Sequence, residues 1–276
     1  WLSVAELHQL SHLDLSLNGQ NLTGSLPSQL SALRNLDFLD VSSNALTGHL
    51  PDFSAINGAA KRSQANASAA VAGAGSSANS DDNDNDDDDD PFELDTANFA
   101  NNLISGTVPA ALGLHTKLAL VDIGFNALSG SLPSTLGELG GSLEVLYASA
   151  NRLDGTLPTQ IGRLERLRYL HADRNAISGT LPSSLGKLRA LRALQLSRDA
   201  ISGSVPTQLG GASDLRSLKL NDNRLDGNLT RWESLGAHAG LSMLDLYNNS
   251  MSGELPASIA RLHKLRFLYV DQTHLR

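Results

Sequence analysis

Apolar residues recur along the chain with a period of 24 residues, far longer than the period of a helix or a strand. The stretch 167–190 reads LRYLHADRNAISGTLPSSLGKLRA, and residue 191 begins the same pattern again. Written as a template, the pattern is LxxLxLxxNxLSGxLPxxLGxLxx. A self-similar period of this length is typical of a solenoid, in which each repeat buries its apolar face only against its neighbours.

Each repeat predicts a short strand, a turn and a return segment. The alternating LxLxx portion predicts a strand with one buried face. The Asn is expected to satisfy backbone groups of the adjacent turn, and the Gly to allow close approach or an unusual backbone angle. The Pro begins a return segment of one or two helical turns. Stacked repeats then predict a parallel sheet with right-handed crossovers, which is a β-rich α/β solenoid.

Ten copies of the repeat align on this Asn, and they span about 10–56 and 92–276 of a single domain, 1–276. Asp199 and Thr273 replace the Asn in the seventh and tenth copies, which predicts weaker side-chain hydrogen bonding there. The tenth copy stops before its Gly, so we expect the strand around Leu268 and Val270 to fray.

The second repeat is interrupted by 34 additional residues, 57–90. This insert begins with an Ala/Ser/Gly/Asn tract and ends with eight Asp in ten positions. Such a composition cannot bury enough apolar surface to offset its ordering entropy, so the sequence predicts a disordered, acidic, low-complexity segment.

A calcium loop is the alternative for the end of this insert. Positions 1, 3, 5, 7, 9 and 12 of such a loop would be Asp82, Asp84, Asp86, Asp88, Asp90 and Glu93. Position 6 is Asp87 where the turn requires Gly, and Pro91 follows within the loop. Diffuse attraction of cations, or plain solubility, is the competing interpretation of the Asp run.

The repeat resembles the plant-type leucine-rich repeat of receptor kinases, receptor-like proteins and polygalacturonase-inhibiting proteins. The pairs that carry the resemblance are Ser129-Gly130, Ser178-Gly179 and Ser202-Gly203, each followed by Leu-Pro or Val-Pro. The resemblance implies a right-handed superhelix with about ten strands on a concave face, short 3-10 turns on the convex face and an extra strand after the main one.

The same resemblance implies an extracellular or cell-surface location. Arrays of this family usually carry Cys-bearing caps, whereas this chain has no Cys and no visible targeting segment. We therefore expect an internal part of a longer protein, with any membrane attachment through a segment outside it.

Composition and motifs argue against several functions. The net charge is −8, divided into −14 for residues 1–162 and +6 for 163–276, and the basic half lacks the excess expected of a nucleic-acid binder. No apolar run is long enough to span a membrane. Nucleophile-elbow, phosphate-loop and dinucleotide motifs are missing, and the His residues form no close metal pair. The sequence predicts a protein that is not an enzyme and binds no cofactor or metal.

Candidate binding residues lie two, four and six positions before each Asn, where side chains point outward from the sheet. All four Tyr of the chain occupy such positions. The candidate ligand-binding residues are Tyr147, Tyr169, His171, Asp173, Lys219, Asp245, Tyr247, Phe267 and Tyr269. Exposed Tyr is favoured at interfaces, although cross-strand packing of aromatics is an alternative explanation.

Three further sets of residues have more than one interpretation. An Asp column (Asp14, Asp40, Asp122, Asp245) is either part of the repeat template or a site for a basic ligand. An Arg ridge (Arg168, Arg192, Arg216, Arg266) is either a solvated rim or an anion-binding surface. Glycosylation sequons occur at Asn21, Asn66, Asn228 and Asn248, about as many as chance provides.

These patterns predict a non-catalytic recognition module that binds a peptide or protein on its concave face. The resemblance suggests an ectodomain fragment of a receptor-like protein or receptor kinase. One alternative is a structural or wall-adhesive array without a discrete ligand, which would bind cell-wall polysaccharide through the Arg ridge. Another is a secreted inhibitor of a wall-degrading enzyme.

Overall fold

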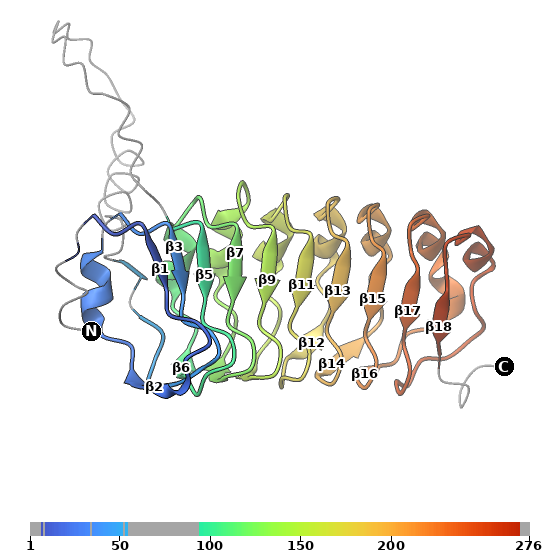
Figure 1. Cartoon of the computed structure of the whole chain (residues 1–276). Helices are drawn as coiled ribbons and strands as arrows, with labels where there is room; N and C mark the ends of the chain where they lie inside the picture. The colour runs from blue at the N-terminus through green and yellow to red at the C-terminus, as the bar shows by residue number, and fades with distance from the viewer. Residues whose placement is uncertain (1–6, 8, 34, 52, 55–93, 271–276) are drawn as a thin grey trace, which may run out of the picture.

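The computed structural model describes residues 7, 9–33, 35–51, 53–54 and 94–270. Within these ranges a ten-stranded parallel sheet, here called the main sheet, runs the length of the molecule (Figure 1). Its strands, in spatial order, are β1 (His12–Asp14), β3 (Phe38–Asp40), β5 (Thr96–Asn98), β7 (Leu120–Asp122), β9 (Val145–Tyr147), β11 (Tyr169–His171), β13 (Ala193–Gln195), β15 (Ser217–Lys219), β17 (Met243–Asp245) and β18 (Phe267–Tyr269). Each repeat contributes one strand, which confirms the predicted solenoid.

Neighbouring strands of the main sheet pair at equivalent repeat positions. The central Leu of β9, Leu146, pairs with Leu170 of β11, which pairs with Leu194 of β13, and all three are 0% exposed. A slip of one residue would turn these Leu out of the core, so their burial fixes the register. Equivalent side chains therefore line up in columns on the outward side of the sheet, which we call the strand face.

A second set of short strands follows the main strands, as the family resemblance implied. Two of these sheets have three strands, β10-β8-β6 and β12-β14-β16, and one has two, β2-β4. The strands are β2 (Gly19–Ser25), β4 (Asn44–Thr47), β6 (Ser105–Thr107), β8 (Ala127–Gly130), β10 (Arg152–Leu153), β12 (Ser178–Thr180), β14 (Ala200–Gly203) and β16 (Arg224–Leu225).

The repeat Gly on this flank is required by both angle and space. Gly179 has a φ of +74°, and a Cβ there would lie 2.7 Å from Cγ2 of Thr156 in the preceding repeat. Gly227 departs from this pattern and has no positive φ. In that repeat Asn228 begins an additional 3-10 turn, η9 (Leu229–Arg231), and the usual Pro is replaced.

The opposite, convex side consists of one 3-10 helix per repeat. These helices are η2 (Ser28–Ala32), η4 (Ala110–Leu114), η5 (Ser134–Leu139), η6 (Thr159–Arg163), η7 (Ser183–Lys187), η8 (Thr207–Gly211), η10 (Glu233–Ala237) and η11 (Ala257–Arg261). All except η10 are preceded by Pro at the N-cap, with φ between −63° and −76°. Proline's fixed φ thus begins the return segment in every one of these repeats except that of η10, as the sequence predicted.

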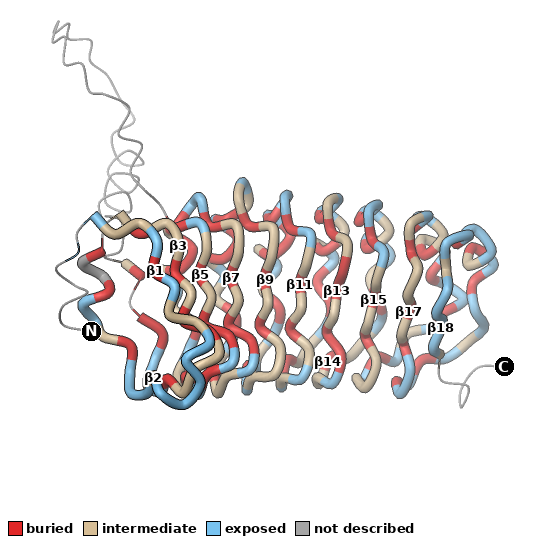
Figure 2. The backbone as a smooth tube through the Cα atoms, in the orientation of Figure 1, coloured by how far each residue is buried: buried red, intermediate tan, exposed pale blue. Residues whose placement is uncertain are grey.

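A continuous apolar core lies between the main sheet and the 3-10 helices (Figure 2). Two His are buried in it with their rings bound to backbone carbonyls. A ring nitrogen of His115 lies 3.0 Å from the Phe53 oxygen, and one of His238 lies 3.1 Å from the Ala212 oxygen. In the last described repeat Leu268 is 39% exposed, whereas Leu244 of the preceding strand is 0% exposed. The fraying predicted for this strand stays a prediction.

The acidic insert 57–90 lies outside the described residues, so both its predicted disorder and the alternative calcium loop stay predictions. Thr273 also lies outside them. Within the described part of the chain, no helix is long and apolar enough to span a membrane.

Candidate functional site

The strand face is held in place by a ladder of Asn side chains, one rung per repeat. In a representative rung, Nδ2 of Asn151 donates to the carbonyls of Ala148 (3.3 Å) in its own turn and of Ile123 (2.9 Å) in the preceding repeat. Its Oδ1 accepts the Leu128 N–H at 2.9 Å. Except for Asn18, which bonds only within its own repeat, and Asp199, each described rung therefore satisfies backbone groups of two repeats at once, which fixes the outward columns relative to one another.

The residue before each rung has a left-handed backbone, a feature that sequence reasoning missed. These nine residues, with φ between 53° and 59°, are Leu17, Ser43, Asn101, Phe125, Ala150, Arg174, Arg198, Asp222 and Asn248. Their constant position in the repeat was the available signal. Three of them take part in ion pairs beside the strand face. Nε of Arg174 is 3.9 Å from Oδ2 of Asp173, and Nε of Arg198 is 3.6 Å from Oδ2 of Asp222.

The first aromatic group consists of Tyr147 on β9 with Tyr169 and His171 on β11. The His171 ring stacks on Tyr147 with centroids 4.7 Å apart and an interplanar angle of 19°. It meets Tyr169 edge-on at 6.3 Å and 83°. All three side chains are half-buried, so part of their surface is used in packing and part is presented outward. Burial raises the pKa of the Tyr147 hydroxyl.

His171 is expected to stay neutral to a lower pH than a free imidazole. Burial lowers its pKa from the usual 6.5, partly opposed by the charge of Asp173. Because the folded pKa is depressed, neutral His171 stabilises the fold above pH 6.5, and this contribution is lost as the pH falls. NMR titration should show a midpoint below 6.5 for this ring. A midpoint at or above 6.5 would contradict the structure.

Asp173, the fourth candidate near this group, is engaged within the protein. Its Oδ1 accepts a 2.6 Å hydrogen bond from Oγ of Ser149 in the preceding repeat. Its other oxygen faces Arg174. Asp173 therefore presents a partly neutralised carboxylate beside His171, and Ser149 is a contributor that sequence reasoning did not single out.

The second aromatic group consists of Tyr247, Phe267 and Tyr269, which are 56%, 49% and 48% exposed. They lie after β17 and on β18, three strands from β11. Within the described residues these rings make no ring-ring contact with one another, unlike the first group. The second group is therefore the more exposed of the two, and β18 is an edge strand of the described sheet.

Polar side chains separate the two groups. Lys219 on β15 pairs in register with Gln195 of β13 on one side and with Asp245 of β17 on the other. It is the only Lys or Arg among the described strand-face positions. The structure thus places Lys219 and Asp245 between the aromatic groups, so that the strand face is apolar at two places and charged between them.

The Asp column has a structural role in every described member. Oδ1 of each carboxylate accepts the N–H two residues later, at 2.9 Å for Asp14, 2.8 Å for Asp40, 2.9 Å for Asp122 and 3.2 Å for Asp245. Burial raises the pKa of Asp122 and Asp245, whereas the Ser16 N–H lowers that of Asp14. These hydrogen bonds close the strand ends and explain the column without a ligand.

The Arg ridge lies at the strand entries, beside the strand face and not on it. Nη1 of Arg168 forms a 2.9 Å ion pair with Oε2 of Glu144. A recess of about 690 Å³ separates Arg216 from Arg266, because Gly240 and Ser242 stand between them. The ridge is therefore a surface distinct from the aromatic groups.

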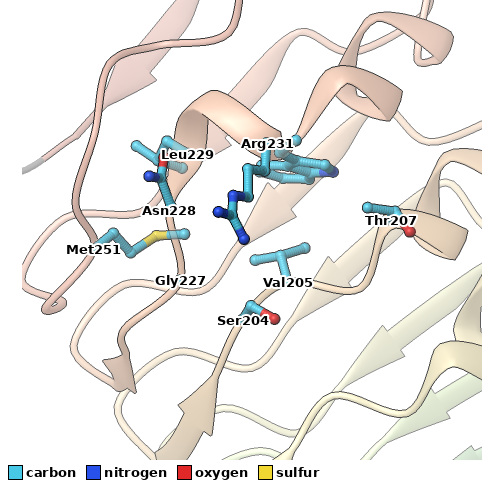
Figure 3. Close-up of a pocket in the computed structure, with 9 residues that line it drawn as sticks. Ser204, Val205, Thr207, Gly227, Asn228, Leu229, Arg231 and Met251 are labelled. Atoms are coloured by element: carbon cyan, nitrogen blue, oxygen red, sulfur yellow. The ribbon is translucent and has the colours of Figure 1, made fainter.

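Three of the four sequons fall on described, exposed residues: Asn21, Asn228 and Asn248. Asn228 starts η9, where its Oδ1 accepts the Thr230 N–H at 2.9 Å, and it borders a recess of about 250 Å³ (Figure 3). Nδ2 of Asn248 donates to Oδ1 of Asp222 at 2.9 Å. Asn66 lies outside the described residues, and glycosylation at all four stays a prediction.

The described residues include no group of three His, Cys, Asp or Glu side chains that could hold a metal ion. The eight Asp of the insert lie outside the described residues, so this finding does not apply to them. The strand face of the described residues is thus a surface of aromatic and polar side chains.

Comparison with known proteins agrees with the repeat pattern. Residues 142–164, 166–188 and 240–262 match the family model for the Leucine Rich Repeat. Receptor-like protein 35 of Arabidopsis thaliana is 30% identical over 167 residues, covering 60% of this chain and 14% of that protein. The chain spans between 6% and 21% of the length of the curated relatives it matches.

Solved structures share the fold over almost the whole chain. The plant peptide hormone receptor RGFR1 in complex with RGF2 has a TM-score of 0.79 and 26% identity, covering 99% of this chain and 37% of that one. A plant ice-binding protein has a TM-score of 0.74 and 24% identity, covering 95% of this chain and 72% of that one, which shows likeness of fold alone.

The relatives identify the array as a non-catalytic, ligand-binding type of module. Its repeats, its curated relatives and its fold agree on one assignment. The chain carries leucine-rich repeats and is similar to the repeat arrays of plant receptor-like proteins and receptor kinases.

Proposed function

We propose that the chain recognises an extended peptide, or an extended segment of a protein, on its strand face. The observation that carries this proposal is the pair of aromatic groups, one on β9 and β11 and the other at β17 and β18, with polar strands between them. Tyr rings supply large, rigid contact area with a hydroxyl for hydrogen bonding, which is why they are enriched in binding hot spots.

The spacing of the groups suggests the form of the ligand. From β11 to β17 there are three strand spacings, or about 14 Å. An extended peptide rises about 3.4 Å per residue, so this distance corresponds to about four residues. A peptide lying across the strands would place apolar side chains about four residues apart on the two groups, with polar side chains facing Lys219 and Asp245.

The comparisons support a peptide or protein ligand. The structure of RGFR1 contains a bound peptide hormone, RGF2, and its fold covers nearly all of this chain. Receptor-like protein relatives also favour an extracellular or cell-surface location for the chain. The identity of the ligand, and the receptor-like role, belong to this proposal.

Binding should depend on both aromatic groups. A displayed library of random 12-residue peptides would be selected on the intact chain, and the affinities of the selected peptides measured for two double variants. Tyr147→Ala/Tyr169→Ala and Tyr247→Ala/Tyr269→Ala are each expected to weaken binding by about 10- to 100-fold, since buried Tyr at hot spots contributes about 2 kcal/mol or more.

A matched control removes exposed apolar surface elsewhere. Leu103 and Leu255 are 61% and 37% exposed and lie off the strand positions, so Leu103→Ala/Leu255→Ala should leave binding unchanged. Selected peptides that bind both Tyr variants as tightly as the unmodified chain would contradict the proposal.

An adhesive function through the Arg ridge is the second candidate, favoured by the recess between Arg216 and Arg266. It predicts binding to acidic polysaccharide that weakens with salt and is lost in Arg192→Ala/Arg216→Ala, with no effect of the Tyr variants. Inhibition of a wall-degrading enzyme remains a further proposal from the family resemblance, without a feature of this chain that singles it out.

A further inference from the structure

Asp199 is the only described rung of the ladder that carries a carboxylate instead of an amide. Its Oδ1 keeps the acceptor half of the rung, taking the Ile177 N–H at 3.0 Å. The Asn rungs on either side make the same bond at the same length, Asn175 to the Leu153 N–H and Asn223 to the Ile201 N–H. The weaker side-chain hydrogen bonding expected at this rung therefore does not concern its acceptor half.

The donor half of the rung is where Asp199 differs. In the next repeat, Nδ2 of Asn223 donates to the carbonyls of Leu196 (2.6 Å) and Leu220 (3.1 Å). The symmetry of the ladder places Oδ2 of Asp199 before the equivalent carbonyls, those of Ala172 and Leu196. This Oδ2 is buried and has no hydrogen-bond partner. An ionised carboxylate has only acceptors, whereas a protonated one can donate to a carbonyl.

Within the described part of the chain, no ion pair involves Asp199. On the sixth repeat, Arg174 faces Asp173 and not Asp199. Arg198, which lies in the same turn as Asp199, forms its ion pair with Asp222 of the eighth repeat. Burial is the main cause that raises the pKa of Asp199 to about 7, and the charge of Asp173 adds to it, against the lowering effect of the Ile177 and Asn175 N–H groups.

We propose that Asp199 is a proton-dependent rung. As a neutral acid it completes the hydrogen bonding of the ladder between the sixth and eighth repeats, and when it ionises this hydrogen bonding is disrupted. Protonated, the carboxyl donates to a carbonyl of the turn as the amide does elsewhere. Ionised, it leaves a buried negative charge facing carbonyl oxygens, which is unfavourable. The strands beside this rung are β11, which carries part of the first aromatic group, and the polar strands β13 and β15. The rigidity of this part of the strand face would therefore vary with pH whether or not a peptide binds there.

The direction of the effect follows from the raised pKa. The stabilisation by Asp199 is complete below the ordinary pKa of 3.8 and is lost as the pH rises through about 7. For a group of this pKa, the equilibrium constant for local opening should increase about tenfold from pH 6 to pH 8.

Hydrogen exchange of the intact chain at pH 6 and pH 8, corrected for intrinsic rates, tests this. Protection of the amides of Ile177 and Ile201 should fall by up to about tenfold in the unmodified chain. In Asp199→Asn protection should be equal at both pH values and at least as high as in the unmodified chain. The gain-of-effect variant Asn223→Asp should show the same pH dependence one repeat later, around Leu225.

Asp226→Asn is the matched control, because it removes an exposed acid of the neighbouring repeat that is neither a rung nor the partner of Arg198, and it should behave like the unmodified chain. Equal pH dependence in the unmodified chain and in Asp199→Asn would overturn the proposal, as would lower protection of Asp199→Asn at pH 6. If that variant does not fold, carbon-13 NMR of the unmodified chain decides: a carboxyl titration near pH 7 supports the proposal, and one near pH 4 overturns it.

Discussion

Replacing Gly186 with alanine is expected to lower the free energy of unfolding by about 2–3 kcal/mol, the cost of overpacking a close contact. Gly186 lies in η7, where the backbone of the next repeat passes directly over it. A Cβ at this position would overlap the backbone oxygen of Gln208 in η8 and lie 2.5 Å from its carbonyl carbon. The contact is with backbone, so no side-chain rotation can relieve it.

The helix η8 cannot easily move away, because Leu209 beside Gln208 is 0% exposed and its N–H is bonded to the Pro206 oxygen at 2.9 Å. Urea unfolding of Gly186→Ala and Gly141→Ala would measure the effect. A Cβ on Gly141 has no neighbour within 4 Å, so this control should change stability by less than about 0.5 kcal/mol. Equal stabilities of the two variants would show that the helices are not in close contact.

Replacing Asn102 with alanine is expected to cost about 2–4 kcal/mol, because several buried backbone groups lose their partner. Asn102 is 7% exposed and joins the second repeat to the third across the insert. Its Oδ1 accepts the Leu46 N–H at 3.0 Å, and its Nδ2 donates to the carbonyls of Val41 (2.9 Å) and Phe99 (3.2 Å).

The variant Asn102→Asp separates the two halves of this rung, since it keeps the acceptor and loses the amide donor. Urea unfolding at pH 5 and pH 8 should place it near the original chain at the lower pH and near Asn102→Ala at the higher one. Solenoids can unfold repeat by repeat, so hydrogen exchange should show the loss concentrated in the first three repeats. If Asn102→Ala unfolds within about 0.5 kcal/mol of the original chain, the ladder is not a major source of stability.

The sequence predicted the architecture because the interactions that define it recur within one period. Strand Leu such as Leu170 are buried by alternation, and Pro such as Pro182 sets the φ that begins a 3-10 helix. Both effects act over a few residues and over the adjacent repeat. They are therefore readable from spacing alone.

Contacts between repeats were harder to predict, because they depend on how closely the backbones approach. The template contained Gly186 and its equivalents, but only the structure shows that the next helix passes over them. From the sequence alone, the Asp column was either part of the repeat template or a site for a basic ligand. Hydrogen bonds such as that from the Ser42 N–H to Asp40 assign it a structural role. The extra turn η9 arises where Thr230 replaces the Pro of the usual Leu-Pro pair and Asn228 caps the turn.

For the candidate site, periodicity placed the rings on one surface but could not give their contacts. His171 was selected as a neighbour of two Tyr, and the structure shows it stacked on Tyr147. Asp173 was selected as an outward acid, and the structure engages it with Ser149. Such pairings depend on side-chain rotamers in adjacent repeats, which a template of residue types does not specify.

Photo-crosslinking of a selected peptide is the most direct test of whether the strand face is the recognition surface. The peptide would carry a photoreactive phenylalanine at each of its apolar positions in turn, and the crosslinked residues would be located by mass spectrometry. The structure predicts crosslinks within 145–149, 169–173, 243–247 and 267–270, which contain the two aromatic groups. Crosslinks confined to the 3-10 helices of the convex side would contradict it.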